Sequence, residues 1–122
     1  MHQLSEYQKK ITLDKQVINH VKKIIRPIIL FKLEEFNRYY NFSYNRVSIR
    51  HQKSRWGSCS SDGNLNFNCK LLCVRDELIN YVVVHELCHL KEMNHSKKFW
   101  ALVAETIPHY KELRRELKNI GN

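Results

Sequence analysis

The chain has 122 residues, of which 43% are hydrophobic, and it contains three glycines and two prolines. This fits one globular domain with a modest core and excludes a disordered or low-complexity chain. The formal net charge of +9 favours contact with polyanions such as nucleic acid, although a solvated basic surface explains it equally well.

Two segment types are missing from the sequence. No apolar run approaches the roughly 20 residues that span a bilayer. The start, MHQLSEYQKK, lacks the apolar stretch of a secretory signal. We therefore expect a cytoplasmic protein that makes no membrane contact.

The first expected element is a long helix from about residue 14 to 40, where apolar residues recur at helical spacing. Pro27 interrupts it. Because proline lacks a backbone donor and clashes with the preceding turn, we expect a kink or a break at this point.

A small sheet should follow. Val47, Ile49 and His51 alternate with polar residues, which is a strand period. Two further strand-like runs, 56–60 and 65–69, flank Asp62-Gly63, a pair that supplies the positive φ angles of a tight hairpin turn. We expect three antiparallel strands.

Helices resume after the sheet. Asp76 is the expected N-cap of a helix that is apolar on most sides, as a buried central helix should be. Ser96 can cap another helix over 97–106, and Pro108 suits the first turn of a last helix. The order of elements predicts an α+β fold in a single domain, 1–122.

The central helix contains His85, Glu86 and His89 in an H-E-x-x-H pattern. Residues four apart on a helix differ by about 6 Å along the axis and about 40° around it, so the two histidines can share one metal ion. Glu86 lies about 100° around from His85, where it can act as general base on a metal-bound water.

A third ligand is needed. His95 follows His89 by six residues, and Asn94 tolerates the left-handed conformation that would end the helix and turn the chain back. Glu105 is the alternative third ligand. Cys88 is a rival because thiolates bind zinc, but its helical angle favours a core position. Histidines that bind no metal are the remaining interpretation.

The other cysteines carry no metal motif. No two of the four cysteines form a C-x-x-C pair, which counts against a zinc ribbon or a redox dithiol. We expect free thiols, most of them buried.

Five segments resemble the YgjP-like metal-dependent hydrolases, cousins of the SprT-like zinc peptidases. They are RWGSC (55–59), LNFNCKLL (65–72), YVVVHELCHL (81–90), NHSKKFW (94–100) and IPHY (107–110). The resemblance covers about 47–117. It implies a compact zincin-like domain in which His85, His89 and His95 hold one zinc ion per chain and Glu86 is the general base. The β-rich N-terminal region usual in the family is missing from this sequence, which has at most the first helix in its place.

The resemblance also suggests substrate contacts. In zincins an edge strand above the active helix binds an extended peptide. The 56–60 strand is our candidate for this role, with Trp56 and Gly57 as contacts, and a hairpin that serves only packing is the alternative. Arg55 and Tyr110 are further candidate contacts. Possible partners of a developing oxyanion are Arg55, Tyr81, His109 and Tyr110.

The favoured function is a zinc-dependent metallopeptidase that acts on a peptide or protein. A zinc-dependent hydrolase of nucleotides is the second hypothesis, because the motif specifies the metal-bound water and not the bond that is cleaved. The third is a basic nucleic-acid-associated module with structural zinc. Glu86 argues against the third, since a structural site favours four closed ligands and has no use for a carboxylate there.

Overall fold

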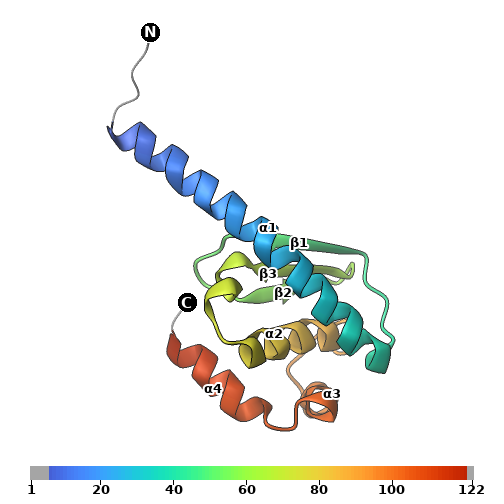
Figure 1. Cartoon of the computed structure of the whole chain (residues 1–122). Coiled ribbons are helices and arrows are strands. Elements are labelled where there is room, and N and C mark those ends of the chain that lie inside the picture. The colour runs from blue at the N-terminus through green and yellow to red at the C-terminus, as the bar shows by residue number, and fades with distance from the viewer. Residues whose placement is uncertain (1–5, 121–122) are drawn as a thin grey trace.

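The computed structural model describes residues 6–120, with side chains from residue 14 onward. Its elements follow the expected order of helix, sheet and helices (Figure 1). They are α1 (Glu6–Tyr40), β1 (Arg46–Arg50), β2 (Gly57–Cys59), β3 (Asn64–Asn68), the 3-10 helix η1 (Cys69–Cys73), α2 (Asp76–His89), α3 (Lys97–Thr106) and α4 (Tyr110–Ile120). The α+β prediction is confirmed, and η1 was not anticipated.

The first helix continues through Pro27 as one element. The predicted break is therefore wrong. Ile25, Ile29 and Leu33 on either side of the proline are fully buried, so packing against the rest of the domain holds the helix together across the missing hydrogen bond. The N-terminal part of α1 extends away from the other elements in Figure 1.

The sheet has the order β1-β3-β2 and is mixed. β2 and β3 form the expected antiparallel hairpin, but β1 runs parallel to β3, contrary to the all-antiparallel prediction. Asn68 explains the arrangement. Its fully buried amide donates to the carbonyls of Gln52 (2.8 Å) and Arg55 (2.7 Å), so the β1–β2 connection passes the end of β3 and leaves β3 in the centre.

The hairpin turns where Asp62-Gly63 predicted, although only Gly63 adopts a positive φ, of 81°. Its N–H donates to the Ser60 carbonyl, and the Ser60 N–H donates to the Asn64 carbonyl, both at 3.0 Å. This is a three-residue loop with glycine in the left-handed position, a common hairpin solution.

Two of the expected helix caps can be compared directly. Ser96 accepts a hydrogen bond from the Phe99 N–H and caps α3, as predicted. Asp76 is the first residue of α2 instead of its cap, which is Arg75. The Asp76 carboxylate instead pairs with Lys32 of α1 at 2.6 Å and so ties the two helices together.

α2 is the centre of the core. Most of its residues are buried, on nearly all of its sides, between α1, β2, α3 and α4. All four cysteines are free, as expected, but only two of them, Cys69 and Cys88, are buried, whereas Cys59 is half-buried and Cys73 is exposed. Within residues 6–120, no helix is long and apolar enough to cross a membrane.

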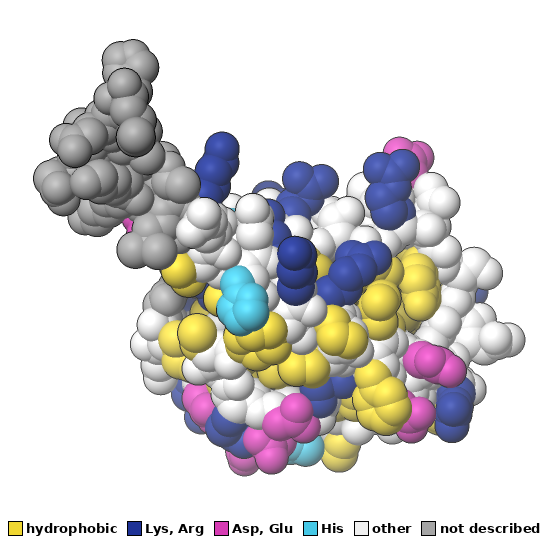
Figure 2. Space-filling model, turned by 45° about the horizontal axis from the view of Figure 1, so that its top comes forward, with side chains coloured by type: hydrophobic (Ala, Val, Ile, Leu, Met, Phe, Trp, Pro, Cys, Tyr) yellow, Lys and Arg dark blue, Asp and Glu magenta, His cyan; other side chains and the backbone are white. Residues whose placement is uncertain are grey.

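Figure 2 shows how charge is distributed over one face. Lys and Arg side chains are spread across it with hydrophobic and uncharged side chains between them. On this face the +9 charge does not gather into one continuous groove.

The uninterrupted α1 makes Pro27 a test of helix energetics. Its side chain is exposed, so Pro27→Ala creates no cavity. Alanine restores a helical hydrogen bond and removes a clash, and we expect the free energy of unfolding to rise by about 1–2 kcal/mol in urea denaturation. Pro108→Ala, in the turn before α4, restores no helical hydrogen bond and should not stabilise. Lower stability of Pro27→Ala would contradict this account.

Candidate metal centre

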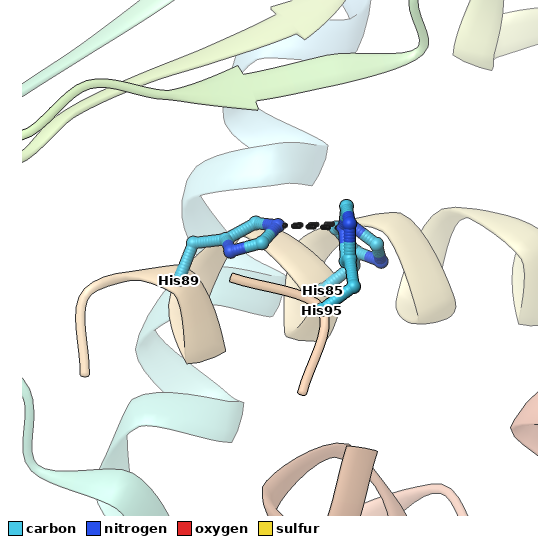
Figure 3. A group of neighbouring side chains, drawn as sticks. All are labelled: His85, His89 and His95. Carbon is cyan, nitrogen blue, oxygen red and sulfur yellow. Dashed lines mark hydrogen bonds between the residues drawn. The ribbon is translucent and has the colours of Figure 1, made fainter. Parts of the chain in front are cut away.

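The three predicted histidines converge on one point (Figure 3). His85 and His89 lie one turn apart near the end of α2, and the 90–96 loop returns His95 to them. Their three Nε2 atoms are separated from one another by 3.1 Å. Asn94 does not adopt the expected positive φ, since Asn41 is the only non-glycine residue in the described chain that does.

The arrangement fits a metal ion and not a hydrogen-bonded cluster. A neutral imidazole nitrogen either donates or accepts, so three nitrogens in an equal triangle cannot all bond to one another. Two nitrogens that bind a tetrahedral zinc ion at about 2.0–2.1 Å lie roughly 3.3 Å apart, close to the spacing observed here. The donor set is therefore compatible with one zinc ion bound by three histidines.

Neighbouring groups orient two of the rings. The Nδ1 atom of His89 lies 3.0 Å from the Glu92 carbonyl, which can only accept, so Nδ1 carries the proton and Nε2 keeps its lone pair. The Nδ1 atom of His85 lies 3.2 Å from the Tyr81 hydroxyl. Such outer hydrogen bonds fix the tautomer and the ring angle of metal-binding histidines.

The electrostatics also suit ligands. Burial lowers the pKa of His85 to about 3, and the nearby His89, His95 and Arg114 add to the effect. Burial is also the main reason that the pKa of His89 is lowered. Both rings are therefore neutral at neutral pH, as metal binding requires.

Glu86 lies beside the histidines and is 5% exposed. Burial raises the pKa of its carboxyl to about 8, against the opposing charge of Arg55. The side chain is packed against β2. A Cβ atom added to Gly57 would lie 3.0 Å from Glu86 Oε2 and 3.1 Å from the Asn66 carbonyl oxygen. Gly57 thus makes room for Glu86, a role that the sequence analysis did not foresee.

A cavity of about 570 Å³ opens over the three histidines and Glu86. Three of the predicted substrate contacts, Arg55, Trp56 and Gly57, line it, and so does Tyr81. The fourth, Tyr110, does not. It stacks on Trp100 with a centroid separation of 5.0 Å and lines a neighbouring cavity.

The alternative ligands lie elsewhere. Glu105 accepts a hydrogen bond from the Tyr39 hydroxyl of α1 at 2.9 Å and is not part of the cluster. Cys88 is fully buried, and burial raises the pKa of its thiol to about 12, which keeps it protonated. It occupies the core position that its helical angle suggested.

Two cations of the cavity wall were not anticipated as site residues by the sequence analysis. Arg114 and Lys118 of α4 line the cavity opposite the sheet. Leu113 and Leu117 turn one face of α4 toward the core, and each is followed by one of these two cations. This spacing can be read from the sequence, but only the contact between α4 and α2 places the two cations at the cavity.

A family model described as "YgjP-like, metallopeptidase domain" matches residues 2–120. The chain belongs to the YgjP-like family. The match includes α1, upstream of the 47–117 range in which the motifs were recognised. A YgjP-like metallopeptidase domain is a metal-dependent hydrolase, and the three-histidine cluster provides the place for a metal ion.

Solved structures agree with this assignment. The metallopeptidase zymogen of Pyrococcus abyssi abylysin is 27% identical, with 77% of this chain and 97% of that chain covered and a TM-score of 0.67. The metallopeptidase zymogen of Methanocaldococcus jannaschii jannalysin is 22% identical, with 75% and 94% covered and a TM-score of 0.65, and it supports the fold alone. A comparison with curated proteins finds no match.

The raised pKa of Glu86 has a consequence for stability. In chelator-treated protein, the unfolded chain ionises this carboxyl near pH 4.5 but the folded chain keeps its proton up to about pH 8. The free energy of unfolding should therefore fall as pH rises through this window. Glu86→Gln has no such proton to lose. The melting temperature of Glu86→Gln minus that of the unsubstituted protein should grow from pH 4.5 to 8 and then level off, and a constant difference would contradict the burial argument.

Proposed function

We propose that this YgjP-like protein is a zinc-dependent peptidase in which His85, His89 and His95 bind one zinc ion and Glu86 is the general base. The observation that carries the proposal is the meeting of three ring nitrogens, 3.1 Å apart, beside one buried carboxylate in an open cavity. A structural zinc site would be closed by four ligands. The described residues supply three, which favours a catalytic site over a structural one.

The bound zinc would supply a Lewis acid and a water whose pKa is lowered to about 7. The protein supplies the proton transfer. Glu86 would accept a proton from the attacking water and pass it to the leaving amine, and burial raises the pKa of its carboxyl above the ordinary value and so makes it a stronger base. Gly57 keeps Glu86 in place by leaving room for its carboxylate.

The exposed edge of β2 supports a peptide substrate. In the hairpin, the Trp56 carbonyl accepts from the Asn68 N–H at 2.9 Å, and the Ser60 N–H donates to the Asn64 carbonyl. Paired groups alternate along an antiparallel ladder, so the N–H and C=O groups of Gly57 and Cys59 point away from β3. β2 is an edge strand and both residues line the cavity, so an extended peptide can add to this edge.

The alternative role for this hairpin, packing alone, explains only part of the geometry. Trp56 is half-buried and packs against the core, but it also lines the cavity. The hairpin therefore serves both packing and the cavity wall. Hydrolysis of nucleotides stays the second hypothesis and shares the same metal chemistry. The edge strand and the metallopeptidase relatives favour the peptide.

Metal content tests the ligand assignment. Protein purified without chelator should contain about one zinc ion per chain. His95→Ala should lose most of it, as measured by atomic emission of dialysed protein. Glu105→Ala is the matched control and should retain zinc, because its carboxylate bonds to Tyr39 outside the cluster. The reverse pattern would transfer the third-ligand role to Glu105.

Turnover tests the role of Glu86. Glu86→Gln should retain zinc and melt at a similar temperature when zinc-loaded, while kcat on a peptide identified from a quenched-fluorescence library should fall about 10² to 10⁴-fold. Gly57→Ala should also lose activity with zinc retained, because the new methyl displaces the Glu86 carboxylate. Cys88→Ser should change neither the rate nor the zinc content much. Full activity of Glu86→Gln would eliminate the proposed base.

A further inference from the structure

Four exposed cations of α4 lie beside the candidate metal centre. We call Lys111, Arg114, Arg115 and Lys118 the α4 basic strip. All four line a second cavity of about 410 Å³ together with Trp100 and Tyr110. Arg114 and Lys118 also line the cavity over the metal ligands, so the two cavities adjoin. A substrate in the catalytic cavity can therefore extend into the second cavity and contact the α4 basic strip.

The charges in the two cavities are strongly one-sided. Glu86 is the only carboxylate among the residues that line the catalytic cavity, whereas Arg55, Arg114 and Lys118 line it as cations. The second cavity is lined by the four cations of the strip and by no carboxylate. Leaving the histidines aside, Glu86 is thus the only acidic group that lines the two cavities, and all the other charged groups that line them are positive.

Among the described residues, no acidic side chain neutralises the strip. Over the described side chains, no carboxylate lies within ion-pair distance of its four members. Glu116, on the same helix, is engaged elsewhere: both of its oxygens accept from Arg75 at 2.7 Å. As far as the described side chains go, the charges of the strip thus remain available for a ligand.

Aromatic stacking, and not an acidic partner, positions the central cation of the strip. The Arg114 guanidinium carbon lies 5.0 Å from the centre of the Trp100 ring. Trp100 in turn stacks on Tyr110 and on the metal ligand His95. A guanidinium over a ring keeps its N–H groups free at the edge, where they can form two parallel hydrogen bonds to a carboxylate.

We propose that the α4 basic strip binds acidic side chains of the peptide substrate and makes the enzyme selective for acidic segments. This selectivity in cleavage rests on the proposed peptidase function, whereas binding to the strip does not. A nucleic acid suits the site less well. Proteins that bind single strands offer open aromatic faces to the bases, but the Trp100 ring is already covered by Tyr110, His95 and Arg114.

The test uses two sets of three peptides, one set for each side of the cleaved bond, and the peptides of a set differ only in one block of three residues. A sequence cleaved by the zinc-loaded full chain is extended by three glutamates, three glutamines or three lysines, first on one side of the cleaved bond and then on the other. On one side, kcat/KM should be about 10-fold higher for the glutamate peptide than for the glutamine peptide, and lower still for the lysine peptide, as several weak ion pairs combine. The glutamate preference should shrink as salt is added.

Charge reversal supplies the matched variants. Arg115→Glu/Lys118→Glu reverses two exposed members of the strip, and Lys97→Glu/Lys98→Glu makes the same charge change on α3, outside both cavities. The first variant should lose the glutamate preference and cleave the lysine peptide faster than the unsubstituted protein does. The second should keep the original order. Equal zinc content and equal melting temperature would show that both variants are folded. A general loss of activity cannot explain faster cleavage of the lysine peptide, because such a loss slows the cleavage of every peptide.

Fluorescence anisotropy separates this proposal from the proposed function. It uses labelled peptides with the same three blocks, placed on the cleaved sequence or, if no sequence is cleaved, on a glycine-serine peptide of equal length. If no peptide is cleaved but the glutamate peptide binds best and loses that advantage in Arg115→Glu/Lys118→Glu, the strip is supported and the peptidase proposal fails. If peptides are cleaved with no preference for glutamate, the peptidase stands and the strip is overturned. An oligothymidylate of equal length that binds the strip more tightly than the glutamate peptide would likewise overturn it in favour of nucleic acid.

Discussion

The burial of α2 on nearly every side is the constraint on which the rest of this protein depends. A helix of 14 residues can form the centre of so small a domain only if other elements cover its apolar sides, and α1, β2, α3 and α4 do so. The two histidines of the motif lie at its C-terminal end, where the enclosure opens into the cavity. The same packing that stabilises the fold therefore keeps water from His85 and His89 and lowers the pKa of both rings.

Contact between the sheet and α2 buries the carboxylate of Glu86. Glu86 points from the helix toward β2, and the strand passes closely because residue 57 has no side chain. Burial makes an ionised carboxylate costly in this position, as its raised pKa indicates, and the charge of Arg55 offsets that cost only in part. A bound metal ion would offset that cost.

Most of the charged side chains around the site are positive, a feature that the family assignment does not specify. Membership of the YgjP-like family accounts for a metal-dependent hydrolase. It does not explain why three cations and a single carboxylate line the cavity. Arg55 approaches from the sheet side and Arg114 and Lys118 from α4, so a substrate in the cavity lies between positive groups. Acidic residues in the substrate are the simplest chemical counterpart.

The sequence by itself determined the features that depend on neighbouring residues. Helical spacing aligned His85 with His89, glycine placed the hairpin turn, and Ser96 capped its own helix, because each effect acts within one or two turns of chain. Tertiary structure alone decided the rest. Asn68 set β3 between β1 and β2, Glu105 bonded to α1 and not to the histidine cluster, and Arg114 came to line the cavity over the histidines. Each of these depends on contacts between residues far apart in the chain. Packing against α1 and α2 decides which of these residues meet, and such packing leaves no periodic signal in the sequence.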